Sequence, residues 1–487
     1  MDKLSFIRSV IKMSKSGLAN RFLIRKMDSF LYDKIVNHDP LNVEEVRIRK
    51  FQFISSMLHM AMKNIRKGYI SPGIIEKLAE VLIENSFFKE SAEIVNKRKI
   101  FFEEHGFQAP SFITLSPTGN CNLSCQGCYA GSDRNGSASL PWETVDRIVA
   151  DVHDSFGAHF ITISGGEPFM YNDGGHTIFD IFSKYDDMFF LIYTNGTLIS
   201  REVAAKIAKT GNATPAISVE GFEKDTDERR GPGTHSRILR SFENLRSEGV
   251  PFGISVTATS RNIDSLLGEN FYEYYFEELG ATYMWQFQFL PIGLGNNAFN
   301  LVVNPDNRVK LYNMWEKQLS ENKRCIADFW NSGMITCGCI AYGGNHGYIY
   351  INWDGNIMPC VFVPYYIDNI KDLYKKNLGL TDALNSEFMK RGREWQNEYG
   401  LSHQKTAGNW LMPCSFRDHY KNFVENILTD DARPENPEAA EIMNNRDYFE
   451  KMNNYDMELK ELTEPIWKYK YMKEAAPGLI KSQINKI

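Results

Sequence analysis

The sequence is poor in the features that mark secreted, membrane-spanning or nucleic-acid-binding proteins. It has eight cysteines in 487 residues, too few for a disulfide scaffold. No uninterrupted apolar run approaches the length of a membrane span, and no signal-peptide pattern follows the start. The net charge of −6 gives no electrostatic reason to expect a nucleic-acid partner. We therefore expect a soluble, cytoplasmic protein that does not bind nucleic acid.

The sequence also lacks internal repeats and low-complexity segments, so its organisation follows from local patterns. Residues 1–108 repeat apolar positions at helical spacing, whereas residues 109–324 alternate short β-rich runs with helical ones. Residues 325–425 are rich in loops and hold clustered cysteines, and residues 426–487 form a charged tail with a helical pattern. The sequence thus predicts four regions.

Six β–α alternations fill the second of these regions. Its strand-like runs are, in order, FITLS, HFITIS, FFLIYT, PAISV, FGISVTAT and MWQFQFL. Repeated β–α units give parallel strands with right-handed crossovers, which form either an open barrel or a doubly wound sheet. In both architectures the active site lies at the carboxyl ends of the strands. Polar motifs at those ends are therefore candidate functional residues.

Three of the eight cysteines lie in one short loop, CNLSCQGC, directly after the first predicted strand. Cys121, Cys125 and Cys128 could hold three corners of a [4Fe–4S] cube and leave the fourth iron open to an outside ligand. Gly127 permits a close approach of the backbone. A zinc site with a distant fourth ligand is the alternative, and the spacing by itself leaves both possibilities open.

Polar groups follow the next three predicted strands. SGGEP ends the second strand, TNGT the third and SVEG the fourth, and DERRG then adds two arginines. The carboxylate of Glu167 could hold an ammonium group, and the arginines suit a carboxylate. Gly165 and Gly166 expose bare backbone to a ligand. A ligand with both an ammonium and a carboxylate is an amino acid or a derivative of one, and these two groups could chelate an open iron.

These motifs, in this order, resemble those of the radical S-adenosylmethionine (SAM) enzymes over roughly residues 110–300. The resemblance implies a partial (β/α)6 TIM-like barrel, a [4Fe–4S] cluster on the three cysteines, and SAM bound to the open iron. The implied reaction is reductive cleavage of SAM to a 5′-deoxyadenosyl radical, which abstracts hydrogen from an unactivated C–H bond. It implies an anaerobic oxidoreductase or bond-forming transferase that takes its electron from a reductant such as flavodoxin or ferredoxin.

The resemblance also assigns cofactor contacts. The residues concerned are Tyr129, Gly165, Gly166, Glu167, Asn195, Ser218, Arg230 and Leu290. Residues 165–167 would contact the ammonium group of SAM, Asn195 and Ser218 its ribose or carboxylate, and Arg230 its carboxylate. Leu290 follows the sixth strand and is a weaker candidate for the adenine wall, because packing in the core explains it equally well.

A second group of cysteines lies in the loop-rich region. INWDGNIMPC predicts a strand, an Asp-Gly turn and a second strand that presents Cys360 near its end. This pattern resembles the opening of the SPASM auxiliary-cluster domain or of the shorter twitch domain, but the compact four-cysteine run of the full pattern is missing. The resemblance implies one auxiliary [4Fe–4S] cluster on Cys339, Cys360 and Cys414. Its fourth ligand is left open to Cys337, to His419 or to substrate.

Two other functions compete with a radical enzyme: a non-catalytic iron–sulfur electron carrier and a zinc-stabilised binding protein. Neither explains the polar groups at successive strand ends. Auxiliary domains of this kind often accompany the modification of peptides or proteins. Residues 1–26 are basic and amphipathic, so they could instead lie on the inner membrane face and reach a lipid or hydrocarbon chain. Packing of this helix on its own domain is the simpler interpretation.

Overall fold

A computed structural model gives the fold of most of the chain. It describes residues 17–38, 43–81, 92–131, 138–344, 347–401 and 407–474. Within these ranges no helix combines the length and the apolar character that a membrane span requires. Residues 1–16 of the predicted amphipathic start lie outside the described residues.

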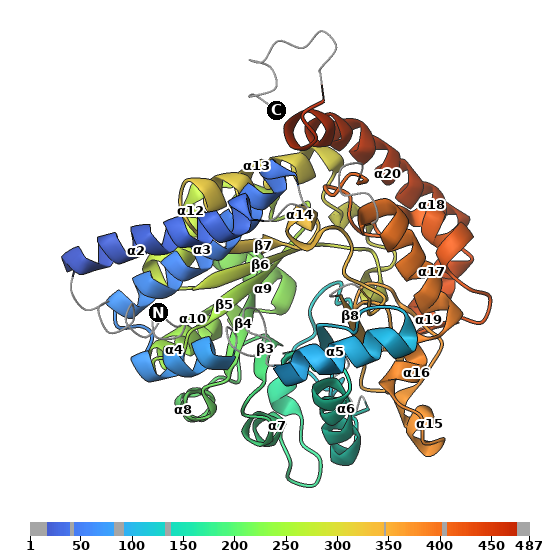
Figure 1. The fold of residues 1–487 in the computed structure, drawn as a ribbon, viewed down its shortest axis with the longest axis horizontal. Helices are drawn as coiled ribbons and strands as arrows, with labels where there is room; N and C mark the ends of the chain where they lie inside the picture. The colour runs from blue at the N-terminus through green and yellow to red at the C-terminus, as the bar shows by residue number, and fades with distance from the viewer. Residues whose placement is uncertain are drawn as a thin grey trace.

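Six parallel strands form the centre of the molecule (Figure 1). They are β1 (Phe112–Leu115), β2 (Phe160–Ile163), β3 (Phe189–Thr194), β4 (Ala213–Val219), β5 (Gly253–Ala258) and β6 (Tyr283–Gln288). Each pairs in parallel with the next along the chain. Their β-branched and aromatic side chains are mostly buried, as expected for strands covered on both faces. The predicted partial barrel is confirmed.

Helices cover the outer face of the sheet. They are α6 (Trp142–Asp154), α7 (Ile178–Lys184), α8 (Arg201–Thr210), α9 (Glu223–Arg230), α10 (Thr234–Ser247), α11 (Ile263–Leu267), α12 (Glu269–Tyr272) and a π-helical turn (Glu273–Glu278). In α6, Val145, Ile148, Val149 and Val152 are fully buried, which is the i, i+3, i+4, i+7 stripe of a helix packed on a sheet. DERRG, which follows the fourth strand as expected, forms the end of helix α9.

The sheet continues beyond the six strands at both edges. β7 (Ile326–Asp328) pairs with β6, and β8 (Tyr348–Ile351) pairs in parallel with β1. The predicted hairpin is present, because β9 (Ile357–Met358) returns antiparallel to β8. Its Asp-Gly turn needs a left-handed residue, which Gly355 supplies at φ +88°. Since β8 joins the sheet of the barrel, Cys360 is held in a fixed position relative to the first cysteine loop.

The remaining elements surround the barrel. On the N-terminal side they are α2 (Gly17–Tyr32), a π-helical turn (Asp33–Asn37), α3 (Glu44–Arg66), α4 (Pro72–Ala79) and α5 (Ala92–His105). After β6 come short 3-10 turns (Gly293–Gly295, Phe299–Leu301), α13 (Pro305–Ser320), α14 (Gly333–Thr336), α15 (Ile370–Lys375), α16 (Leu380–Leu384), α17 (Glu387–Gln396) and a π-helical turn (Asn397–Leu401). The chain ends in α18 (Tyr420–Asn422), two further π-helical turns (Phe423–Ile427, Trp467–Tyr471), α19 (Pro437–Met443) and α20 (Arg446–Ile466), while β10 (Tyr365–Tyr366) pairs with β11 (Arg433–Pro434).

The N-terminal helix α3 lies against both α13 and the C-terminal turn after α20 (Figure 1). Glu316 of α13 is mostly buried and accepts hydrogen bonds from Arg49 of α3, at 2.8 Å, and from Lys470. One continuous apolar core runs from the strands into the C-terminal region and includes Cys360 and Cys414. The second cysteine group is therefore packed rigidly against the barrel.

Candidate active site

The first cysteine loop lies at the carboxyl end of β1, and its three thiols lie close enough to one another to interact electrostatically. Burial raises the pKa of Cys121 to about 11, and nearby Glu167, Cys125 and Cys128 raise it further. Burial likewise raises the pKa of Cys125. Thiols in this setting keep their protons at neutral pH unless a metal centre stabilises the thiolates. The loop has the donor set of a metal site with three sulfur ligands.

Two arginines of α9, Arg229 and Arg230, lie beside this loop and pair with a buried carboxylate. Glu220, which follows β4 and is 1% exposed, accepts a hydrogen bond from Arg230 Nε at 2.8 Å and pairs with Arg229 Nη1 at 2.8 Å. This pairing leaves Arg230 Nη1 at 3.9 Å from the sulfur of Cys125. Arg230 thus places positive charge beside a thiolate, which favours the ionised, metal-bound form.

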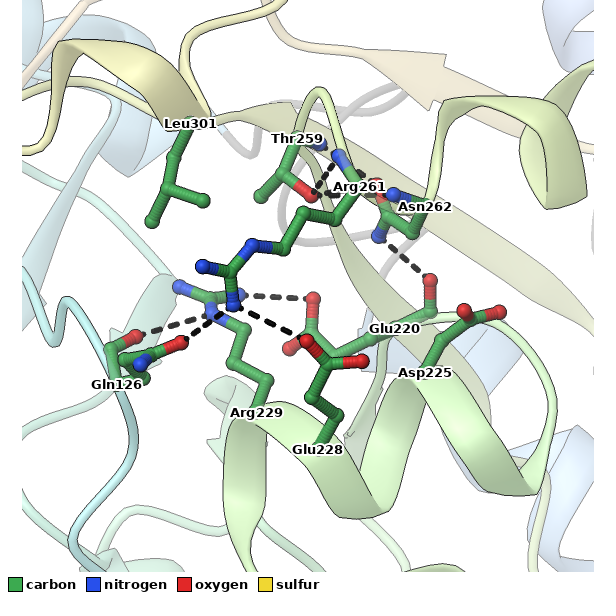
Figure 2. Close-up of a pocket in the computed structure, with 9 residues that line it drawn as sticks. All are labelled: Gln126, Glu220, Asp225, Glu228, Arg229, Thr259, Arg261, Asn262 and Leu301. Carbon is green, nitrogen blue, oxygen red and sulfur yellow. Dashed lines mark hydrogen bonds and ion pairs between the residues drawn. The ribbon is translucent and has the colours of Figure 1, made fainter.

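Figure 2 shows the small cavity behind the loop. It is lined by Gln126, Glu220, Asp225, Glu228, Arg229, Thr259, Arg261, Asn262 and Leu301. Gln126 contributes its backbone N–H to the Arg229 carbonyl at 2.9 Å and its side-chain oxygen to Arg261 at 3.0 Å. The loop is therefore tied to the end of α9 and to the segment that follows β5, and these contacts restrain the spacing of its thiols.

The Gly165–Gly166 pair lets the end of β2 lie directly on the chain that leads to Cys121. A Cβ atom on Gly166 would lie 2.3 Å from the Asn120 carbonyl oxygen, so a larger residue cannot fit without moving backbone. The N–H groups of Gly166 and Glu167 donate to the carbonyls of Thr118 and Asn120, at 2.9 and 2.8 Å. These N–H groups hold the loop, so any ligand contact at the glycines falls to other backbone atoms.

Glu167 is completely buried at the centre of the strand ends. Its carboxylate accepts hydrogen bonds from Thr194 Oγ1 at 2.7 Å, from the Asn195 N–H at 2.8 Å and from the Phe169 N–H at 3.2 Å. Burial raises the pKa of Glu167 to about 7, and these hydrogen bonds oppose the rise. Glu167 therefore positions the TNGT turn, a role that the sequence did not indicate.

The TNGT turn reaches back to the cysteine loop. Asn195 Nδ2 donates to Asn122 Oδ1 at 2.8 Å and lies 3.9 Å from the sulfur of Cys121. Asn122 in turn donates to Thr197 Oγ1 at 2.9 Å. Three of the predicted motifs thus meet around Cys121, as parallel strands that share one edge require.

The second cysteine group is also assembled in space. Cys339, Cys360 and Cys414 interact electrostatically, and burial raises the pKa of each, to about 12 for Cys360. The hydroxyl of Tyr348 lies 2.9 Å from the Cys360 sulfur. The backbone N–H of Arg417 donates to the Cys414 sulfur at 3.3 Å. Donors directed at sulfur stabilise thiolates, so this group too has the character of a metal site.

The other candidates for this second group have different surroundings. His419 Nε2 lies 2.9 Å from the Met412 carbonyl oxygen, so this nitrogen carries a proton and donates it there. Cys337 is in a left-handed conformation, at φ +58°, and Lys50 Nζ lies 3.1 Å from its sulfur. Cys325 is 3% exposed within the apolar core and is an ordinary buried thiol.

The comparisons with known proteins agree with this geometry. Residues 115–273 match the sequence profile of the Radical SAM superfamily. Residues 115–273 form a radical SAM domain. The domain binds a [4Fe–4S] cluster and S-adenosylmethionine. The thiols of Cys121, which is buried, and of Cys125 and Cys128, which are partly buried, fit such a cluster with one open iron.

Two curated radical SAM relatives and one solved structure give the extent of the similarity. The AdoMet-dependent heme synthase of Methanosarcina barkeri is 26% identical over 296 residues, which are 54% of this chain and 80% of that protein. The mycofactocin maturase MftC of Mycolicibacterium smegmatis is 30% identical over 34% of this chain and 41% of its own length. Streptococcus suis SuiB bound to S-adenosylmethionine aligns with a TM-score of 0.50 and 16% identity, over 66% of this chain and 75% of that one. This last likeness concerns the fold alone.

The remaining cofactor residues predicted for the radical SAM domain lie around the same strand ends. The hydroxyl of Tyr129 lies 3.0 Å from Ser164 Oγ, and burial raises the pKa of Tyr129 to about 12. Ser218 is partly exposed on β4 and pairs with Ser255 of β5. Leu290, two residues beyond β6, is buried in the apolar core. Their contacts with SAM stay predictions.

Proposed function

We propose that this radical SAM enzyme abstracts hydrogen from an unactivated C–H bond of a peptide or peptide-derived substrate that is held between its two cysteine groups. The observation that carries the proposal is the position of Tyr129. Its hydroxyl interacts electrostatically with both Cys128 and Cys360, and its ring lies 6.0 Å from that of Phe362. Tyr129 therefore lies near one cysteine of each group, and a substrate beside its ring could reach both groups.

Cys339, Cys360 and Cys414 would hold one auxiliary [4Fe–4S] cluster. The chemistry of the donor set supports this assignment, because the three thiols interact with one another and the sulfurs of the buried Cys360 and Cys414 have hydrogen-bond donors beside them. His419 is a structural residue in this proposal, since its Nε2 proton is engaged by a backbone carbonyl. The fourth ligand would come from substrate or from Cys337.

In this proposal the side chains of the enzyme hold the cluster and SAM, orient the substrate and shield the reaction from water. When bound, the reduced cluster and SAM supply a one-electron cleavage and a radical that abstracts hydrogen. Arg230 keeps positive charge beside Cys125, and Asn195 is positioned beside Cys121 by Glu167. Phe287, Phe329, Trp330 and Phe362 pack with ring centroids 4.9 to 6.4 Å apart and would shield the space near Tyr129 from water. The electron donor would be a flavodoxin or a ferredoxin.

The test is reduction of the anaerobically reconstituted protein by dithionite in the presence of SAM. We expect 5′-deoxyadenosine to form, and deuterium from a labelled peptide substrate to appear in it. The relatives support a role in maturation, since one is named a maturase and another a heme synthase. Absence of 5′-deoxyadenosine from protein with a full complement of iron would contradict the proposal.

Replacement of Glu167 is expected to change how stability depends on pH. Because burial raises the pKa of Glu167 to about 7 from a value near 4.5, the folded protein holds a proton there that the unfolded chain releases. As the pH rises from 4.5 to about 7, the unfolded chain loses this proton first, and the free energy of unfolding falls by about 3 kcal/mol. Below pH 4.5 both states are protonated and this loss is absent. We expect Glu167→Gln to remove this dependence when urea unfolding of the cofactor-free protein is followed at pH 4.5, 6 and 7.5.

The same variant tests the predicted contact with SAM. If Glu167 binds the ammonium group, Glu167→Gln weakens SAM binding about tenfold or more, as measured by equilibrium dialysis. Glu143→Gln, an exchange of the same kind at an exposed residue in the first turn of α6, serves as the control. Unchanged SAM affinity in Glu167→Gln would limit Glu167 to positioning Asn195.

A lipid substrate is the second candidate. Large apolar side chains are exposed on the N-terminal helices, with Phe30 46%, Tyr32 40% and Met57 38% exposed. These exposed side chains and the basic composition of residues 1–26 both favour contact with anionic lipids. We expect the full-length protein to sediment with phosphatidylglycerol vesicles and a variant lacking residues 1–26 to stay in solution. Equal sedimentation of the two proteins would contradict membrane contact through this segment.

A further inference from the structure

Arg417 is a buried cation whose contacts are all neutral within the described part of the chain. It is 1% exposed, and its Nη1 donates to the Phe289 carbonyl at 2.7 Å. Its Nη2 donates to Gln288 Oε1 at 3.3 Å and to the Tyr455 hydroxyl at 3.1 Å. No carboxylate of the described residues forms an ion pair with it. A guanidinium that is removed from water in this way is unfavourable unless an anion balances its charge.

A second buried arginine nearby shows the usual arrangement. Arg308 is fully buried and pairs through two nitrogens with the carboxylate of Asp418, the residue that follows Arg417 in the chain. The acid closest to Arg417 in sequence is thus committed elsewhere. Asp456 is near enough to interact electrostatically with Arg417, but its Oδ2 accepts the Tyr420 N–H at 2.7 Å, and burial raises its pKa. The fold therefore supplies Arg417 with no carboxylate contact of its own among these residues.

Three N–H groups at this place have no hydrogen-bond acceptor. They are Arg417 Nε, Gln288 Nε2 and Trp330 Nε1, all of them buried. The three side chains lie together, because Arg417 donates to Gln288 and its guanidinium carbon lies 5.2 Å from the centre of the Trp330 ring. Buried donors without acceptors are rare in native proteins and need a partner. One positive charge and several unused donors call for a small anion with more than one acceptor oxygen.

This group lies beside the proposed substrate position. Gln288 is the last residue of β6, and the backbone N–H of Arg417 contacts the Cys414 sulfur. Trp330 packs on Phe362 with ring centroids 4.9 Å apart, and Phe362 in turn lies next to Tyr129. A substrate between the two cysteine groups could therefore extend one end to Arg417.

We propose that Arg417, Trp330 and Gln288 bind a carboxylate group of the substrate. The guanidinium would balance the negative charge, and the indole and amide N–H groups would donate to the carboxylate oxygens. This inference rests on the proposed function for the substrate as a whole, but the site itself requires only a carboxylate. That carboxylate could belong to a peptide or to a small carboxylic acid, and the two sources can be separated by experiment.

The test is calorimetric titration of the anaerobically reconstituted full-length protein without turnover. The peptide probe is acetyl-Ala-Ala and the small-molecule probe is glutarate, each compared with its neutral amide. We expect a carboxylate to bind at least about tenfold more tightly than its amide, and this preference to disappear in Arg417→Gln and to persist partly in Arg417→Lys. Tighter binding of the dipeptide than of glutarate would assign the site to a peptide carboxylate, and the reverse order to a small acid.

Two further variants keep the test decisive. Trp330→Phe keeps an aromatic ring but loses the indole N–H donor. We expect it to bind a carboxylate several-fold more weakly than the wild-type protein, and this variant provides a test even if Arg417→Gln fails to fold. Arg446→Gln removes an exposed arginine of α20 and should leave the preference unchanged.

Equal binding of acid and amide to the wild-type protein would overturn the proposal. An Arg417→Gln variant that changes the EPR signal of the auxiliary cluster but keeps the preference for a carboxylate would also overturn it. In that case Arg417 would balance the charge of the cluster and not that of a substrate. Formation of 5′-deoxyadenosine without substrate tests the proposed function separately.

Discussion

Replacing Cys121, Cys125 and Cys128 together by alanine is expected to reduce 5′-deoxyadenosine formation to the background of dithionite and SAM alone. The three sulfurs are the donor set at the end of β1, and without them the loop has no other strong metal ligand. About four irons per chain should be lost with them. The measurements are iron and sulfide content after anaerobic reconstitution, and 5′-deoxyadenosine by chromatography.

The matched control for this variant is Cys325→Ala. Cys325 is also buried but lies in the apolar core away from both cysteine groups, so iron content and cleavage of SAM should be unchanged. A colourless protein that retains zinc would instead support the zinc-stabilised binding protein. A brown protein that fails to cleave SAM, and whose EPR signal does not respond to it, would support the electron carrier. Either result would contradict a radical enzyme.

Replacing Cys339, Cys360 and Cys414 together by alanine is expected to halve the iron content, from about eight to about four per chain. Cleavage of SAM in the absence of substrate should persist, because the first loop is tied to β2, β3 and β4 through its own contacts. Formation of the modified product should be lost, since the proposed auxiliary cluster lies beside the substrate position. The measurements are iron content, 5′-deoxyadenosine and product mass.

Cys337→Ala provides the comparison for the second group. Cys337 lies beside Lys50 of α3, and if it is not a ligand, the variant keeps about eight irons and full product formation. Loss of the auxiliary cluster in Cys337→Ala would make Cys337 the fourth ligand. A wild-type protein that holds only about four irons would remove the auxiliary cluster from the proposal altogether.

The strands and the first site could be predicted because their signals are local. FFLIYT reads as a buried strand from its apolar and β-branched residues alone, and β3 occupies those six positions. The crossover helices follow from spacing in the same way, as Val145 to Val152 of α6 illustrate. Parallel topology then brings SGGEP, TNGT and SVEG to one edge without any knowledge of side-chain contacts. Motif order therefore located the candidate site before its geometry was known.

Contacts between distant segments could not be predicted from the sequence. β8 was expected in a separate region, yet it pairs with β1, more than 230 residues earlier in the chain. The sequence predicted a ligand contact for Glu167, which stays a prediction, but it gave no sign that the carboxylate also accepts hydrogen bonds from Thr194 and Asn195. Neither partner is identifiable from local periodicity, because both depend on which strand ends become neighbours after folding.

The sequence by itself determined the α/β architecture, the three-cysteine loop and the order of the polar motifs, because each depends on spacing within a few residues. Only the tertiary structure decided that Asp418 pairs with Arg308 and leaves Arg417 without a carboxylate contact in the described chain. The physical reason is that buried charges are balanced through space. Arg417 and Asp418 are neighbours in sequence, but the fold directs their side chains to different partners, and charge balance at each site follows from that arrangement.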